Sequence, residues 1–270
     1  MFKTGFIGCG NMGGVLCTCA AKSIGGDNVL ISDRSVEKID SISDKYGAIK
    51  STNEEIAKEC KYIFLGVKPQ VFFDVLSSIT PILNARTDRF ILVSMAAGIN
   101  IASIKKAAGE NVSVVRIMPN TPCSVGSGVV LISNDDTVSV SETDEIENIL
   151  SKCGLTDIIP EGLIDAAGCV SGCGPAFVYM FAEALADGGV HCGLPRDKAL
   201  KYAAQTISGA AQMVLSSGKH PGELKDAVCS PGGTTIEGVR ALEKGRFRSA
   251  AMSAVVKAYE KTLSLLKKTV

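Results

Sequence analysis

The sequence predicts an α/β fold with a doubly wound parallel sheet in its first part and an all-helical C-terminal part. Three observations carry this prediction. Short apolar runs alternate with amphipathic stretches as far as Pro160, no convincing strand follows that residue, and a glycine-rich turn comes directly after the first apolar run. In a chain of 270 residues we therefore expect two domains, 1–160 and 161–270.

The strands are expected where the chain is apolar without alternation, because strands covered by helices on both faces read as continuous apolar runs. Between them lie amphipathic stretches, such as 36–46, 71–79 and 142–151, that have the period of a helix. Alternating strands and helices over this length indicate a parallel sheet. The predicted strands are 5–7, 29–32, 62–67, 90–94, 112–118, 129–133 and 157–159.

The C-terminal part consists of long Ala-rich windows with helical character, at 176–189, 196–217, 235–244 and 248–268. Breaks between them are marked by Pro and Gly, at 220–222 and 230–233. Small residues let helices approach closely, so we expect this part to intertwine with a second copy of the chain. A monomeric bundle packed on its own α/β domain is the alternative.

Composition excludes several classes of protein. Lys plus Arg and Asp plus Glu both number 28, so nothing indicates binding to nucleic acid or an anionic membrane. No apolar run approaches the ~18 residues of a membrane span, and the chain enters a strand too early for a signal peptide. We therefore expect a cytoplasmic protein with no membrane partner.

Ten cysteines occur without a CxxC pair, and only two histidines accompany them. A disulfide framework suits short secreted chains, and a zinc site needs close pairs of ligands. Neither condition is met. We interpret the cysteines as small apolar core residues in a reducing compartment, and we predict no metal site.

The glycine-rich turn has the spacing GxGxxG, after a strand and before a helix, which is the fingerprint of a Rossmann dinucleotide-binding domain. The first glycine permits the tight turn, the second lets a pyrophosphate approach, and the third lets the helix pack on the strand. The free N–H groups of the helix start then face the phosphates. The turn is formed by Gly8, Cys9, Gly10, Asn11, Met12 and Gly13.

The end of the second strand, 20 residues after Gly13, carries Ser32, Asp33 and Arg34. An acidic residue there normally holds the ribose hydroxyls of NAD, and an Arg meets the extra phosphate of NADP. Both are present, so this segment does not settle the cofactor. We expect NADPH to be slightly preferred and NADH to be accepted. Removal of Asp33 is then expected to raise the NADPH preference, and removal of Arg34 to lower it.

Other candidate residues follow the ends of later strands, where ligands of open α/β sheets bind. Lys68 is expected near the cofactor, with a solvated surface Lys as the alternative. Asn120 and Thr121 stand between two prolines in a stiff loop. In the helical part, the segments 171–176 and 230–235 each place small residues before a helix, a pattern typical of a backbone cradle for a carboxylate. Two helix starts without a ligand would look similar.

At this point the chain resembles a known family. The segment 221–243 is similar to the signature of pyrroline-5-carboxylate reductases, and similar motifs recur in the same order along nearly the whole chain. The signature positions are Pro221, Leu224, Val228, Cys229, Ser230, Gly232, Gly233, Thr235, Gly238, Val239, Leu242 and Glu243. The other motifs lie at 8–13, 67–69, 96–98, 118–122, 171–176 and 186–190.

The resemblance implies an N-terminal Rossmann domain, a C-terminal helical dimerisation domain, and a site between them made by two subunits. It implies reduction of the C=N bond of 1-pyrroline-5-carboxylate by NAD(P)H to give L-proline, the last step of proline biosynthesis (EC 1.5.1.2). A homodimer is implied, with a larger oligomer left open. Two positions depart from the family pattern. Ala227 stands where Asn is frequent, and Cys173 stands where Ser is common.

The family's cofactor contacts map onto the glycine-rich turn, 32–34, and Asn53, Val67, Lys68, Pro69, Met95, Ala96 and Ala97. Its substrate contacts map onto Glu161, Thr234 and Thr235. We expect backbone N–H groups around Ser230, Gly232, Gly233 and Thr234 to hold the substrate carboxylate. Thr235 is the expected catalytic residue, because its hydroxyl can hydrogen-bond the ring nitrogen. Glu161 is expected to favour the iminium charge or to orient the ring.

Two other classes of protein fit the sequence less well. A β-hydroxyacid dehydrogenase would need a catalytic Lys in the first long helix after the α/β domain, and 171–189 contains none. A non-catalytic relative that kept the fold is disfavoured by the intact loop at 232–235.

Overall fold

The computed structural model describes residues 3–269, with side chains as far as 264. The chain forms two compact units. The first, called the sheet unit below, comprises the chain up to Gly172 and again from Tyr259. The second, the helical unit, is Cys173–Ala258.

The sheet unit is built on eight strands in the order β3-β2-β1-β4-β5-β6-β7-β8. β1 pairs in parallel with β2 on one side and β4 on the other, so the strand order reverses at β1. Their carboxyl ends share one edge, since Ile7 lies opposite both Ser32 and Leu65. The strands are β1 (Thr4–Ile7), β2 (Val29–Ser32), β3 (Ile49–Lys50), β4 (Tyr62–Leu65), β5 (Ile91–Ser94), β6 (Ser113–Pro119), β7 (Gly128–Asn134) and β8 (Gly154–Ile158).

The doubly wound fold class is confirmed, with one correction to the prediction of a parallel sheet. β7 runs antiparallel to β6, with Met118 opposite Leu131. The connection between them is a short stretch containing the 3₁₀ helix η2 (Thr121–Val125). A parallel crossover needs a dozen or more residues, so a connection of this length can only reverse the chain.

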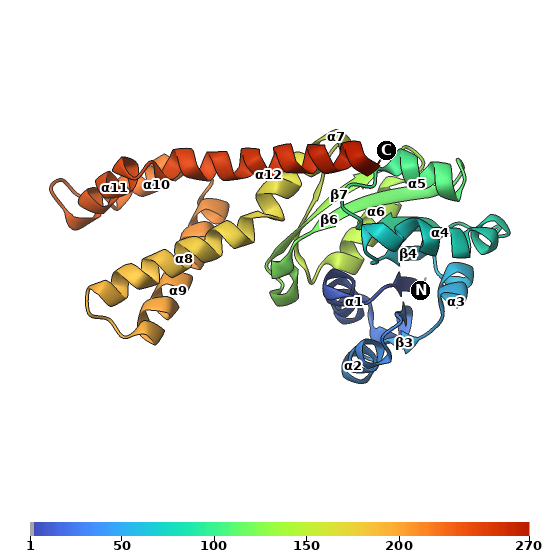
Figure 1. Ribbon diagram of the computed structural model, residues 1–270. Helices are drawn as coiled ribbons and strands as arrows, with labels where there is room; N and C mark the ends of the chain where they lie inside the picture. Colours follow the sequence, from blue (N-terminus) through green and yellow to red (C-terminus); the bar gives the residue numbers. More distant parts are fainter. Residues whose placement is uncertain (1–2, 270) are drawn as a thin grey trace. The chain divides into compact units, whose positions relative to one another are not determined.

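Helices cover both faces of the sheet, and alternate residues of each strand point to opposite layers (Figure 1). One layer packs Phe6 and Phe64 under α1, α2 and α6. The other packs Ile7 and Leu65 under α3, α4 and α5. The helices are α1 (Asn11–Ile24), α2 (Val36–Tyr46), α3 (Asn53–Glu59), α4 (Pro69–Asn84), α5 (Ile101–Ala108), α6 (Val140–Leu150) and α7 (Glu161–Ser171).

Most cysteines of the sheet unit belong to these two layers, as the sequence predicts. Their side chains are free thiols and lie buried at positions 9, 17, 19, 60, 123, 153 and 169. The remaining three, in the helical unit, are partly or fully exposed. Within residues 3–269 no group of three His, Cys, Asp or Glu side chains is arranged to hold a metal ion.

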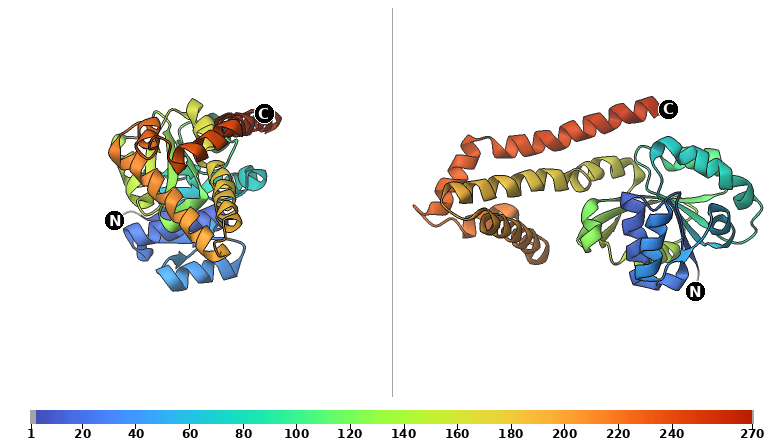
Figure 2. Two further views of the ribbon diagram at one scale, coloured as in Figure 1. Left: turned by 90° about the vertical axis from the view of Figure 1, so that its left-hand side faces the viewer. Right: turned by 60° about the horizontal axis from the view of Figure 1, so that its bottom comes forward.

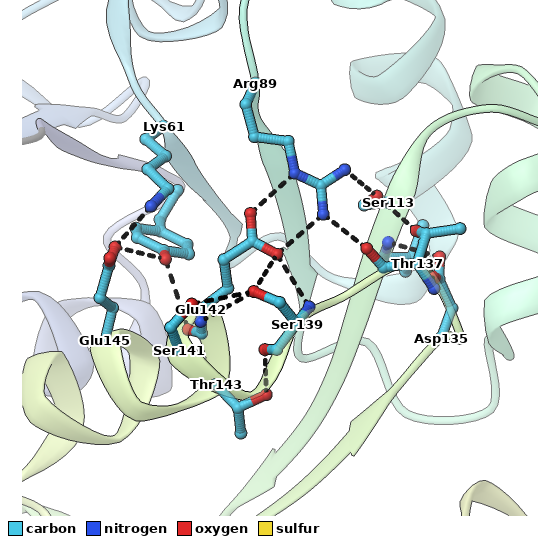
Figure 3. A network of polar contacts seen from close by, with 12 residues as sticks. Lys61, Arg89, Ser113, Asp135, Thr137, Ser139, Ser141, Glu142, Thr143 and Glu145 are labelled. Carbon is cyan, nitrogen blue, oxygen red and sulfur yellow. Dashed lines mark hydrogen bonds and ion pairs between the residues drawn. The ribbon is translucent and has the colours of Figure 1, made fainter.

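A polar network ties α6 to the opposite edge of the sheet, at the amino ends of β5 and β6 (Figure 3). Arg89 holds the Glu142 carboxylate with two hydrogen bonds, from Nε at 2.7 Å and from Nη2 at 2.9 Å. The N–H of Ser139, the residue that caps α6, donates to the same carboxylate at 2.9 Å. The Arg89 hydrogen bond is the main cause that lowers the pKa of Glu142 to about 2.

This network predicts acid-sensitive stability. The folded-state pKa of Glu142 lies below the unfolded value near 4.5, so its contribution is complete above that value and is lost as the pH falls towards 2. We expect Glu142→Gln to lower the free energy of unfolding at pH 7 by about 2 kcal/mol. In urea unfolding, the difference from wild type should shrink between about pH 5 and pH 2. Asp144→Asn, on the same helix but exposed, is the control. A pH-independent difference for Glu142→Gln would contradict the assignment.

The helical unit has very little core of its own. Its buried side chains are Ala186, Ala199 and Ala203, where α8 and α9 lie side by side (Figures 1 and 2). Large apolar side chains such as Met180 and Leu215 are 71% and 81% exposed. Its helices are α8 (Gly174–His191), α9 (Arg196–Ser217), α10 (Pro221–Ala227), α11 (Thr234–Lys244) and α12 (Phe247–Thr269), the last of which continues into the sheet unit.

The units divide 12 residues later than the domains expected from sequence, after Gly172 instead of at 160. The reason is α7, which packs on β6 and β7. Ile164 and Cys169 of this helix are buried, and Gly168 lies so close to Met118 that an added Cβ would be 3.3 Å from its Cγ. The assignment of 161–270 to substrate binding and dimerisation stays a prediction.

One stretch is more apolar than expected. Glu161–His191 is long and apolar enough to cross a membrane by length and composition, with a mean hydropathy of 1.3, so the expectation that nothing approaches a membrane span was wrong by this measure. One such stretch is weak evidence, because core helices of soluble proteins have the same composition. Only 11% of the most apolar 18-residue window of this stretch is buried within the chain.

Candidate active site

A hollow of about 570 Å³ opens at the carboxyl edge of the sheet, where the strand order reverses at β1. This is the place where open α/β sheets bind ligands. Eight of the predicted cofactor residues line it: Gly8, Gly10, Ser32, Asp33, Arg34, Asn53, Val67 and Lys68. The structure thus brings these eight residues together at one hollow, and their contact with a cofactor stays a prediction.

The glycine-rich turn is packed too tightly to carry side chains at two of its positions. Gly8 has a φ of +96°, which favours glycine. A Cβ on Gly13 would lie 2.0 Å from the carbonyl oxygen of Gly8. α1 then starts with Gly10 at its N-cap and no side-chain cap, so its first N–H groups are left for an anion.

Asp33 lines the hollow, and both its carboxylate oxygens are hydrogen-bonded to backbone. Oδ2 accepts the N–H of Cys9 at 2.6 Å, and Oδ1 accepts the N–H of Ser35 at 2.8 Å. Arg34 and Lys38 line the same hollow, and neither has a hydrogen-bonding or ionic partner among residues 3–269. Lys68 lines the hollow too, so among the described residues three cations without a side-chain partner lie at the hollow, together with an Asp33 carboxylate that is already engaged.

Several lining residues were missed by the sequence reasoning. Lys38 lies in the first turn of α2, four residues after Arg34, and this closeness to the predicted segment 32–34 is the signal that could have found it. Ile7 and Gly66 were missed as well, and the others are Val71, Asp74, Val75 and Ser78, which recur at helical spacing along α4. Their presence shows that α4 forms a wall of the hollow.

The remaining predicted cofactor residues lie outside this lining. Cys9 and Asn11 line a neighbouring hollow of about 470 Å³ between α1 and α2, and Met12 and Gly13 belong to the first turn of α1. Pro69 is the first residue of α4. Met95, Ala96 and Ala97 follow β5 in a turn that ends at Gly98, whose φ is +78°.

Glu161, a predicted substrate residue, has other partners within the sheet unit. Its Oε1 accepts the N–H of Ile101 at 2.7 Å and lies 3.6 Å from Nη1 of Arg116. Arg116 is only 2% exposed and also binds Asp165 at 2.7 Å. These contacts join α7 to β6 and α5, so the structure gives Glu161 a part in positioning α7.

Asn120, in the stiff loop after β6, is a second tie to α7. Its Nδ2 donates to the carbonyl oxygen of Ser171 at 2.9 Å, and its Oδ1 accepts the N–H of Val129 at 2.9 Å. The side chain is 7% exposed. It thus holds the end of α7 beside the start of β7.

The loop 230–235 of the helical unit is a tight turn directly before α11, and its predicted role as a cradle for a carboxylate stays a prediction. Gly233 donates its N–H to the carbonyl oxygen of Ser230 at 3.0 Å, and Gly232 has a φ of +67°. A Cβ on Gly233 would lie 2.3 Å from Oγ of Ser230. Helix α11 begins at Thr234 without a side-chain cap, and Thr234 and Thr235 are exposed in the single chain.

The sequence of this chain matches two family models. The model described as pyrroline-5-carboxylate reductase dimerisation matches residues 161–265, and the model described as NADP oxidoreductase coenzyme F420-dependent matches residues 3–98. The pyrroline-5-carboxylate reductase of Escherichia coli (strain K12) is 40% identical over 268 residues, which cover 98% of each chain. This chain belongs to the pyrroline-5-carboxylate reductase family.

Other members of the pyrroline-5-carboxylate reductase family agree. Pyrroline-5-carboxylate reductase 3 of Danio rerio is 43% identical, over 97% of this chain and 91% of that protein. Among solved structures, Plasmodium falciparum pyrroline carboxylate reductase with NADP bound is 35% identical, with a TM-score of 0.84 over 97% of each chain. The Coxiella burnetii pyrroline-5-carboxylate reductase is 29% identical, with a TM-score of 0.91 over 98% of each chain.

Proposed function

We propose that this chain is an NAD(P)H-dependent oxidoreductase that reduces the C=N bond of 1-pyrroline-5-carboxylate to give L-proline, the last step of proline biosynthesis (EC 1.5.1.2). The observation that carries the proposal is similarity over the full length to reductases of this name, at 40% identity. The hollow at the sheet edge and the turn at 230–235 support it, because the first suits a dinucleotide and the second, before an uncapped helix, suits a small carboxylate.

The hollow fits a nicotinamide dinucleotide. The glycine-rich turn leaves no room for a Cβ at Gly13, and the uncapped start of α1 offers N–H groups to the pyrophosphate. Arg34 and Lys38 suit the additional phosphate of NADPH, because both are cations without a partner among residues 3–269. NADPH is therefore the proposed cofactor, with NADH also accepted. The relative from Plasmodium falciparum has NADP bound.

The protein's part in the reaction is to orient the substrate. When bound, the reduced nicotinamide supplies the hydride. The free backbone N–H groups of the segment Ser230–Thr234 bind the substrate carboxylate, while the N–H of Gly233 closes the turn on the carbonyl oxygen of Ser230. The hydroxyl of Thr235 hydrogen-bonds the ring nitrogen and holds its proton in place, while Lys68 lies along the cofactor hollow. Reduction of a protonated C=N bond needs alignment more than acid or base catalysis, which explains a cradle built from small residues.

The test is a steady-state assay of NADPH oxidation with 1-pyrroline-5-carboxylate, in parallel with a panel of hydroxyacids and NADP⁺. We expect turnover with the imine and none with the hydroxyacids. Oxidation of a hydroxyacid in the absence of imine reduction would favour the β-hydroxyacid dehydrogenase class and overturn the proposal.

The same proposal includes a homodimer formed through the C-terminal part, with a larger oligomer open. It is supported by the dimerisation model that matches 161–265 and by the exposure of large apolar side chains on a unit that buries only three alanines. We propose that a subunit interface, not a lipid bilayer, covers the exposed apolar side chains of Glu161–His191, and that the protein is cytoplasmic.

We expect light scattering at micromolar concentration to give the mass of a dimer or larger. Met180→Asp, on α8, should shift that mass towards the monomer. Met180 is exposed in the single chain, and the proposed interface would bury the new charge without a partner, which is costly. Val125→Asp is the matched control, since Val125 is 77% exposed but lies in the sheet unit. A fully active wild-type monomer would contradict the proposal.

A further inference from the structure

Asp33 stands at the end of β2, where an acidic residue normally holds the ribose hydroxyls of NAD. In this chain the carboxylate is turned to the protein's own backbone. Oδ2 accepts the N–H of Cys9 at 2.6 Å, and Oδ1 accepts the N–H of Ser35 at 2.8 Å. Hydrogen bonds to a charged acceptor at these distances are of the strong kind.

The Cys9 hydrogen bond acts on the glycine-rich turn. The preceding residue, Gly8, donates its N–H to the carbonyl oxygen of Ser32 at 2.7 Å. Two consecutive N–H groups of the turn are therefore held by the end of β2, one by the Ser32 backbone and the other by the Asp33 side chain. The next N–H groups belong to the start of α1 and have no side-chain cap. The hydrogen bond from the Cys9 N–H to the Asp33 carboxylate thus fixes the direction in which those free N–H groups point.

We propose that Asp33 is a positioning residue for the pyrophosphate-binding turn and that it does not select between NADPH and NADH. The proposal rests on the proposed nicotinamide cofactor but not on the identity of the substrate. Discrimination between the cofactors then lies with cations of the hollow such as Arg34. This reverses the result expected from sequence, in which loss of Asp33 raises the NADPH preference.

Two fragments of the cofactor separate the possible roles of Asp33. ADP carries the pyrophosphate and a free 2′-hydroxyl but lacks the 2′-phosphate, whereas 2′-AMP carries the 2′-phosphate and lacks the pyrophosphate. 2′-Deoxy-ADP, which also lacks the 2′-hydroxyl, is the control: an equal loss of affinity for ADP and 2′-deoxy-ADP assigns the effect to the turn, and a loss for ADP alone would assign it to the ribose and overturn the proposal. We expect calorimetric titration of Asp33→Ala to show ADP binding weakened by about tenfold or more, the equivalent of one lost charge-assisted hydrogen bond. Binding of 2′-AMP should stay within about twofold of wild type, because its phosphate does not use the turn.

Three further variants sharpen the test. Asp33→Asn keeps the volume and one acceptor, so its loss of ADP affinity should be smaller than that of Asp33→Ala. Arg34→Ala should show the opposite pattern, with 2′-AMP weakened and ADP unchanged. Glu37→Gln removes a negative charge from the first turn of α2, outside the lining of this hollow, and should leave both affinities unchanged.

Tighter binding of 2′-AMP to Asp33→Ala, with ADP unaffected, would show that Asp33 repels the phosphate and would overturn the proposal. Equal weakening of both fragments together with a lower melting temperature would overturn it too, because Asp33 would then only support the fold. Because neither fragment takes part in hydride transfer, these results hold or fail independently of imine reduction. A wild-type protein that shows the expected fragment pattern but reduces no imine would refute the proposed function alone.

Discussion

Thr235→Ala should lower kcat for imine reduction at least tenfold, which corresponds to about 1.4 kcal/mol of barrier. Thr235 is the second residue of α11, directly after the Gly232–Gly233 turn, and its hydroxyl is the group proposed to meet the ring nitrogen. Without that hydrogen bond the imine is held only by its carboxylate and can rotate away from the hydride donor. The dissociation constant of NADPH should stay nearly unchanged, because the glycine-rich turn belongs to the sheet unit.

The matched controls for this variant are two. Thr235→Ser retains the hydroxyl and should recover most of the turnover. Thr234→Ala removes the neighbouring hydroxyl. Because backbone N–H groups are the proposed carboxylate donors, the fold increase in KM of this variant should be smaller than the fold decrease in kcat of Thr235→Ala. Turnover close to wild type in Thr235→Ala would remove Thr235 from the mechanism.

Gly13→Ala should raise the dissociation constants of both NADPH and NADH by about tenfold or more. The added Cβ would lie 2.0 Å from the carbonyl oxygen of Gly8, a backbone atom that cannot move without opening the turn. Overpacking of this kind costs about 1–3 kcal/mol, and the resulting backbone shift falls in the turn that is expected to bind the pyrophosphate.

Fluorescence titration of the reduced cofactors measures this effect. The matched control is Gly162→Ala, because a Cβ at Gly162 would meet open space. Both variants should be checked for an intact fold by circular dichroism. Cofactor affinity in Gly13→Ala equal to that of the Gly162→Ala control would mean that the turn adapts and does not need its tight geometry.

The fold and the cofactor loop were largely predictable, because their signals are local. The glycine spacing at 8–13 follows an apolar strand, and the predicted helices 36–46 and 196–217 match α2 and α9. The antiparallel β7 was not predictable from its residues, since Val129 to Ser133 read as an apolar run like those of the parallel strands. What decides its direction is the short connection through η2.

The candidate site was harder to predict, because a residue's position does not fix its partner. Asp33 was correctly placed at the end of β2, but only the folded turn shows that Cys9 and Ser35 take its two oxygens. Glu161 likewise lies where the family pattern puts it, and the contacts with Ile101 and Arg116 arise from packing between distant segments. Such contacts depend on side-chain direction and tertiary packing, which leave no local signal in the sequence.

The small core of the helical unit has a consequence for how this chain folds. A unit whose described buried side chains are Ala186, Ala199 and Ala203 gains little from removing apolar surface from water. Association with a second copy of the chain must then supply its stability, so its unfolding temperature rises with protein concentration. The sheet unit, with two extensive apolar layers, carries no such dependence. On heating at low protein concentration, the helical unit should therefore unfold before the sheet unit. A single melting temperature would then not describe the chain.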